Sequence, residues 1–134
     1  MTKTFIIALL TAASFAALSL ISGAPYLNAK LFGHLPVGKA LTAIGLCAAT
    51  AAAIGLSARG TLHRRVCIAA FLTAAAWLPL SIALAGNLDL NLSGSRGEIW
   101  MLISLGTLAL VAITLLWALA SAAFGALAHR RAGN

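Results

Sequence analysis

Residues 99–128 read IWMLISLGTLALVAITLLWALASAAFGALA, a run that contains no Asp, Glu, Lys, Arg or His. As a helix rising ~1.5 Å per residue, it is longer than the ~30 Å hydrocarbon core of a bilayer. A continuous helix also satisfies the backbone hydrogen bonds that lipid cannot supply. The run therefore predicts a membrane-spanning helix, and its excess length predicts that this helix is tilted or projects from the membrane.

Three further apolar runs have the same character. They cover residues 4–22, 40–57 and 66–85, and none contains a charged side chain. With 62% hydrophobic and 8% charged residues in a chain of 134, little sequence remains outside the four runs. We expect an all-α integral membrane four-helix bundle that forms one domain over residues 1–134. The first run follows Lys3 as in a signal peptide, but it is long for an h-region, which favours a retained helix.

The basic residues are divided unevenly between alternate ends of these runs. The two chain ends and the 58–65 loop carry most of them, while both acidic residues lie in the last of the other loops. The positive-inside rule therefore predicts that both termini are cytoplasmic, and we expect the inner membrane of a bacterium. In a membrane protein the net charge of +7 indicates attraction to anionic headgroups rather than to nucleic acid. The residues expected to contact lipid headgroups or a partner are Arg59, His63, Arg64, Arg65, Arg130 and Arg131.

The first and third runs resemble each other. At an offset of 62 residues, ALLTAASF at 8–15 aligns with AFLTAAAW at 70–77. A duplicated hairpin of two spans would keep both copies in the same orientation, which is a parallel repeat about the membrane normal. Two segments rich in Ala and Leu also match by composition alone, so both interpretations stay open.

Small residues indicate how the helices could pack. Helix association in lipid depends on close approach and hydrogen bonds, because lipid tails are as apolar as Leu. We expect the second helix to be the most buried and the Leu-rich faces of the first and fourth to meet lipid. Serine and threonine hydroxyls should mostly bond carbonyls of their own helix, and Pro79 predicts a kink in the third. The helix-packing candidates are Gly45, Ala49, Gly55, Ala122 and Gly125.

Residues that could carry chemistry are few. The three histidines lie in loops or at the ends of the runs, and Cys47 and Cys67 form no Cys-x-x-Cys pair, so we expect two free thiols and no metal site. Asp89 and Glu98 are the only carboxylates, and Arg96 is expected to pair with Glu98 at the surface. We therefore predict no catalytic residue, no enzyme activity and no cofactor, and the sequence identifies no cofactor-binding residue.

Three functions remain after this reading. The first is a non-catalytic accessory or scaffold subunit of a larger membrane complex, whose partners are the bilayer and other membrane subunits or a second copy of the chain. The second is an oligomeric channel or transporter for a small or neutral solute, which would use hydroxyls or carbonyls in place of buried charge. The third is a subunit associated with haem or quinone, which would need side chains directed into the bundle.

Overall fold

The chain is mostly helical. A computed structural model describes residues 1–134, of which 80% are helical. Four of its helices are each long and apolar enough to cross a membrane. A two-stranded antiparallel ribbon, in which Lys30 lies opposite Pro36, precedes the second helix. The elements in chain order are α1 (Lys3–Ser22), η1 (Pro25–Asn28), β1 (Lys30–Leu31), β2 (Leu35–Pro36), α2 (Val37–Leu56), α3 (Leu62–Ala85) and α4 (Gly94–Ala132).

Local capping sets the ends of the helices. The hydroxyl of Thr2 accepts a hydrogen bond from the Phe5 amide at the start of α1, and that of Thr61 accepts one from the Arg64 amide at the start of α3. Gly23 and Gly86 end α1 and α3 in the left-handed conformation that glycine adopts without strain. The helices α2, α3 and α4 begin before the apolar runs do, because their first turns, which carry charged side chains, are also helical. Hydropathy detects the lipid-embedded part of a helix, and it does not detect the capped ends.

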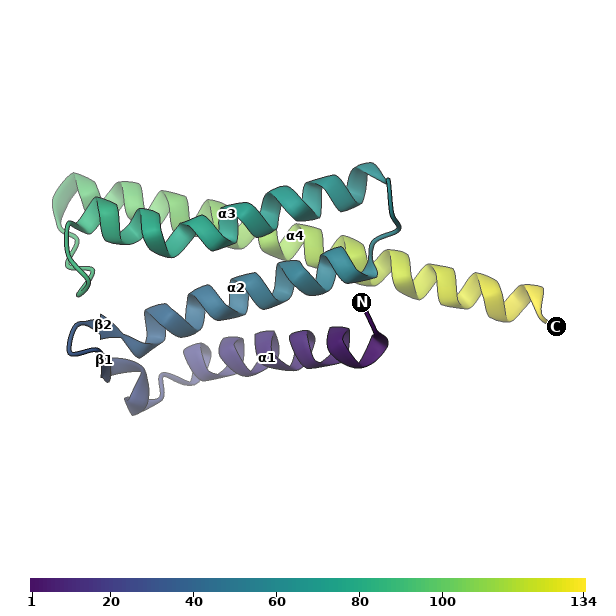
Figure 1. Cartoon of the computed structure of the whole chain (residues 1–134), viewed down its shortest axis with the longest axis horizontal. Helices are drawn as coiled ribbons and strands as arrows, with labels where there is room; N and C mark the ends of the chain where they lie inside the picture. Colours follow the sequence, from purple (N-terminus) through teal and green to yellow (C-terminus); the bar gives the residue numbers. More distant parts are fainter.

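The four helices alternate in direction. Figure 1 shows the N-terminus, the α2–α3 connection and the C-terminus at one end of the molecule. We call this the arginine-rich end, because Arg59, Arg64 and Arg65 lie in or beside the α2–α3 connection and Arg130 and Arg131 lie near the C-terminus. The connections from α1 to α2 and from α3 to α4 lie together at the other end, which we call the loop end.

The second helix lies at the centre of the packing. α2 packs against α1, α3 and α4, whereas α1 packs chiefly on α2. In the most apolar window of each helix, 39% of α2 is buried, against 11% of α1 and 17% of α4. The expectation that the second helix is the most buried is thus confirmed. Small side chains dominate the buried positions, and the larger hydrophobic ones among them are Leu46, Trp77, Leu90 and Val111.

The fourth helix extends past the other three. α4 contains 39 residues, which gives a length of about 58 Å. Its last segment stands apart from the other helices at the arginine-rich end (Figure 1), and no residue after Ala118 is buried. α4 thus projects beyond the other three helices, and its tilt in the membrane or projection from it stays a prediction. We call residues 119–132 the α4 extension.

Serine and threonine hydroxyl groups donate hydrogen bonds to backbone carbonyls of their own helices. Thr50, for example, donates to the Leu46 carbonyl at 2.9 Å, and Thr114 donates to that of Leu110 at the same distance. The prediction of bonds from residue i to i−4 is confirmed at Thr11, Thr42, Thr50, Thr73, Ser81, Thr107 and Thr114.

Candidate functional site

A lysine from α2 lies over a tryptophan from α4 at the loop end. Lys39 is in the first turn of α2 and half-buried, and its ammonium is 4.0 Å from the centre of the Trp100 ring. Such a cation–π contact stabilises an ammonium at a partly desolvated site. No carboxylate lies within ion-pair distance of Lys39. The face of the Trp100 ring is therefore the partner of its charge.

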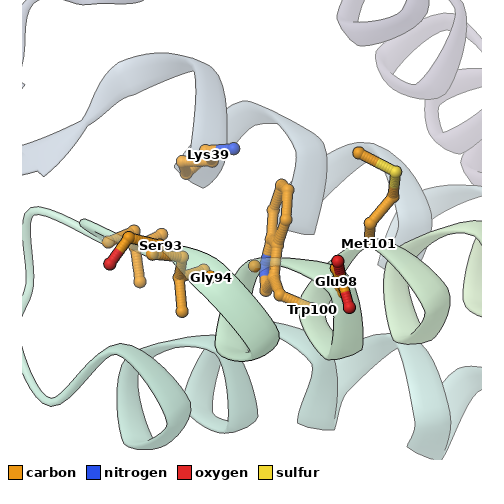
Figure 2. Close-up of a pocket in the computed structure, with 9 residues that line it drawn as sticks. Lys39, Ser93, Gly94, Glu98, Trp100 and Met101 are labelled. Atoms are coloured by element: carbon orange, nitrogen blue, oxygen red, sulfur yellow. The ribbon is translucent and has the colours of Figure 1, made fainter.

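The same two residues line a pocket. It has a volume of about 380 Å³, and Figure 2 shows Lys39 reaching from α2 toward the first turns of α4, where Trp100, Glu98 and Met101 lie. Glu98 lines this pocket and has no ion-pair partner. We call this cavity the Lys39 pocket. It therefore holds one unpaired cation and one unpaired anion.

Two indole groups fix the wall below the pocket. The Trp100 N–H donates to the Ser81 hydroxyl at 2.9 Å, and the Ser81 hydroxyl donates to the Trp77 carbonyl at 2.7 Å. The Trp77 N–H donates to the Ser104 hydroxyl at 2.9 Å. These bonds connect α3 to α4 twice and satisfy both buried donors, as lipid-embedded polar groups require. The position of Trp100 under Lys39 is therefore held from both helices.

The carboxylates pair differently from the expectation. Asp89 accepts a hydrogen bond from Lys30 at 3.2 Å and lies 3.6 Å from His34, so it connects the two loops of the loop end. The Lys30 hydrogen bond lowers the pKa of Asp89 below its ordinary range. The expected pair of Arg96 with Glu98 is absent. Residues two apart in a helix do not face each other, which explains this correction.

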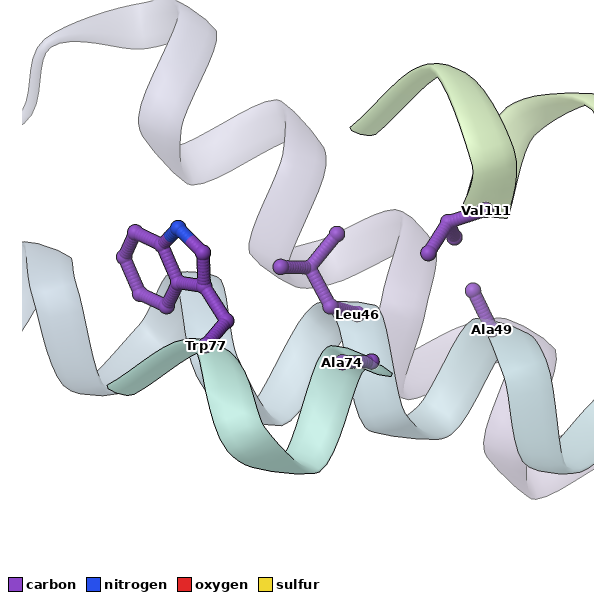
Figure 3. Packing of buried hydrophobic residues seen from close by; sticks show 5 residues of the cluster. All are labelled: Leu46, Ala49, Ala74, Trp77 and Val111. Atoms are coloured by element: carbon purple, nitrogen blue, oxygen red, sulfur yellow. The ribbon is translucent and has the colours of Figure 1, made fainter. Parts of the chain in front are cut away.

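The predicted packing positions on α2 lie at close contacts. A Cβ added to Gly45 would meet that of Ala16 on α1 at 2.8 Å, and one added to Gly55 would meet the Met1 sulfur at 2.6 Å. Ala49 is buried in a cluster with Leu46, and Figure 3 shows both on α2, between Trp77 of α3 and Val111 of α4. Gly45 therefore lies where α1 approaches α2 closely.

The predicted packing positions on α4 lie in the α4 extension. Ala122 is half-buried and Gly125 is exposed. No neighbouring atom lies within 4 Å of a Cβ added at Gly125. The small residues of this segment thus have no partner helix within the chain, and a packing role for them stays a prediction.

A polar cluster closes the α2–α3 turn. The His63 ring lies between Ser57, at 3.0 Å from the hydroxyl, and Cys67, at 3.5 Å from the sulfur, and it packs 4.2 Å from the Trp117 ring centre. The Arg64 guanidinium donates at 3.4 Å to two carbonyls at the end of α2, those of Ile54 and Ser57. Side chains that bond the last carbonyls of a helix stabilise its C-terminus. The Cys67 side chain is fully buried within this cluster.

The remaining predicted positions are at the surface. Arg59, Arg65, Arg130 and Arg131 are exposed at the arginine-rich end, and Arg64 is half-buried. Contact of these residues and of His63 with headgroups or a partner stays a prediction. Pro79 lies exposed within α3, which is helical on both sides of it, and the kink also stays a prediction. Both cysteines are free thiols, as expected.

Sequence reasoning missed the Lys39 pocket. Lys39 is one basic residue among several near an apolar run, and Trp100 lies far from it in sequence. The available signal was a lysine without a nearby acid at the start of a span, opposite a tryptophan at the start of another. Only the packing of α2 against α4 brings the two together.

The comparisons with known proteins identify no match to the chain. No protein family matches it, and neither the curated proteins nor the solved structures include a match.

Proposed function

We propose that this protein is a non-catalytic accessory or scaffold subunit of a larger membrane complex. The α4 extension carries the proposal. It projects beyond α1, α2 and α3 and is apolar up to His129, with Phe124 and Leu127 exposed. Contiguous apolar surface beyond the end of a folded unit is typical of a contact with another protein. The small residues Ala122 and Gly125 would allow a partner helix to approach closely.

The internal hydrogen bonds favour this function over a pore. A neutral-solute channel requires hydroxyls or carbonyls that face a passage. Here the buried hydroxyls of Thr50, Thr107 and Thr114 donate to carbonyls of their own helices. The Ser81 and Ser104 hydroxyls accept from indole groups. The side chains that could line a path are thus engaged in hydrogen bonds, within one helix for the threonines and between α3 and α4 for Ser81 and Ser104.

We also propose that the chain lies in a bacterial inner membrane with both termini cytoplasmic. The support is the gathering of exposed arginines at the end that holds both termini. We further propose that the chain is a tandem repeat of two helical hairpins. Its support is that the α1–α2 hairpin and the α3–α4 hairpin have the same orientation. In this arrangement the α4 extension reaches into the cytoplasm beside the membrane.

Site-specific photo-crosslinking in native membranes tests the accessory function. A photoreactive residue replaces Ala122 in the α4 extension, and a matched one replaces Leu72, an exposed residue of α3 within its span. We expect Ala122 to crosslink to a different protein chain in stoichiometric yield and Leu72 to crosslink chiefly to lipid.

Two other outcomes of this experiment would reject the proposal. If Ala122 crosslinks only to a second copy of the chain, the homo-oligomeric channel becomes the better account. If Ala122 and Leu72 give the same lipid adducts and no protein adduct, the α4 extension is no subunit contact. A Gly125→Leu variant that abolishes the adduct places the contact on the small-residue face.

A further inference from the structure

The Lys39 pocket continues into an apolar groove. A smaller cavity of about 180 Å³ is also lined by Lys39 and Trp100, and it extends along the chain interior to Thr42, Leu46 and Leu108. These last three residues also line a cavity of about 550 Å³ bounded by α1, α2 and α4. We call this larger cavity the apolar groove. The Lys39 pocket and the apolar groove therefore each share lining residues with the smaller cavity.

The groove exists because α1 and α4 both pack on α2 and leave space between them. Its floor is α2, where Gly45 and Ala49 have little or no side chain, and its walls are apolar residues of α1 and α4. Along α4 it extends from Leu108 to Leu119, which is about 16 Å at the helical rise. One leaflet of a ~30 Å core has about this depth. The groove therefore has about the length of one leaflet. On α2 it begins at Thr42, one turn beyond Lys39, and on α4 it begins at Leu108, two turns beyond Met101 of the Lys39 pocket.

The charges at its mouth select among possible occupants. Lys39 needs an anion, because its only close partner is the Trp100 face. Glu98 is exposed and no basic residue pairs with it, so its carboxylate is available to a cation. A phosphate would satisfy the first and an ammonium group the second. An apolar tail would fill the groove below them, which a free phosphate cannot do.

We propose that the Lys39 pocket and the apolar groove bind one phospholipid with a phosphoethanolamine head. Lys39 binds the phosphate, Glu98 binds the primary ammonium, and one acyl chain lies in the groove between α1 and α4. An anionic phosphoglycerol head would leave Glu98 unpaired beside further negative charge, and a trimethylated choline head donates no N–H hydrogen bond to Glu98. This site meets the α4 extension only at Leu119, and it does not depend on the accessory function.

Native mass spectrometry of the full chain with defined lipids tests the site. The protein is released from detergent with equimolar phosphatidylethanolamine, phosphatidylglycerol and phosphatidylcholine, and the bound lipid is identified. We expect one tightly held phosphatidylethanolamine per chain. Lys39→Met should weaken this binding about fivefold, the effect of one interfacial charge. Lys30→Met is the matched control, because Lys30 lies at the same end but pairs with Asp89, and it should bind as the unmodified chain does.

Two further variants separate the head from the tail. Glu98→Gln should abolish the preference for phosphatidylethanolamine over phosphatidylglycerol while lipid binding itself persists. Ala112→Phe places a ring in the groove from an exposed position of α4 and should weaken all three lipids equally without unfolding the chain, which circular dichroism checks. Equal binding of the three lipids by the unmodified chain overturns the proposal. Unchanged binding by Lys39→Met, or displacement of the lipid by inorganic phosphate, overturns it as well.

Discussion

The face of α2 around Gly45 and the α4 extension carry the same kind of small-residue pattern, and only the first has a neighbour. An added Cβ at Gly45 would meet Ala16 at 2.8 Å, whereas one at Gly125 would meet nothing within 4 Å. Small residues thus indicate where a helix can be approached closely, and the rest of the chain decides whether anything approaches. In α2 the contact is internal, and at Gly125 of α4 the chain supplies no contact.

The largest effect is expected where this contact is tightest. Gly45→Leu should force α1 away from α2. The added side chain would meet the Ala16 methyl group, which is bonded directly to the α1 backbone and cannot rotate aside. Overpacking of this kind destabilises by about 1–3 kcal/mol. Thermal unfolding in detergent should show a lower midpoint. Gly106→Leu is the matched control in α4, where an added Cβ has open space, and equal midpoints for the two variants would contradict the packing of α1 on α2.

A smaller effect is expected from the hydrogen bonds between α3 and α4. Ser81→Ala leaves the Trp100 N–H without its acceptor, and membrane-embedded hydrogen bonds of this kind contribute about 0.6 kcal/mol on average. The unfolding midpoint should fall slightly, and tryptophan fluorescence should change as Trp100 moves. Ser95→Ala, at an exposed position in the first turn of α4, is the control. A fluorescence spectrum unchanged by Ser81→Ala would reject the arrangement of the indoles.

A weak pH dependence is expected at the loop end. The hydrogen bond from Lys30 lowers the pKa of Asp89, so the ionised carboxylate is favoured in the folded chain. The stabilisation is present above the ordinary aspartate pKa of about 4 and is lost as the pH falls through the lowered value. Because Asp89 is at the surface, the change should be confined to the loops. Hydrogen exchange of residues 86–93 should accelerate on acidification, and Asp89→Asn should remove that response; acceleration that persists in Asp89→Asn would exclude this ion pair as the cause.

The smallest effect is expected in the α4 extension. Gly125→Leu should leave the unfolding midpoint of the purified chain unchanged, since no neighbour lies within contact distance. The same measurement as for Gly45→Leu serves here, which makes the two glycines a direct pair. A clear loss of stability from Gly125→Leu would show that this segment folds back onto the chain.

Much of the fold could be predicted because lipid imposes a strict rule. A run such as 99–128 has no stable form in a bilayer other than a helix, and the four runs lie within the four observed helices apart from Ser57, which follows the last residue of α2. The charged first turns were missed, as at His63 to Arg65 in α3, because hydropathy does not detect caps. The short strands β1 and β2 were also missed, since two-residue strands leave no periodic pattern.

The candidate site was harder to predict than the fold. The close approach at Gly45 is a local property that a small residue indicates by itself. The Lys39 pocket depends on which helix lies beside which, and the alternation of apolar runs does not specify that. The same limit explains why the Asp89 contact with Lys30 was not foreseen, because their separation along the chain is 59 residues.

Labelling with a membrane-impermeant thiol reagent tests the central claim, that the chain crosses the bilayer four times with both ends on one face. Single cysteines replace Phe32, which is 95% exposed in the β1–β2 turn, and Asn134 at the C-terminus. The account predicts that sealed vesicles label one of these positions and inverted vesicles label the other. Labelling of both positions from the same side of the membrane would contradict it.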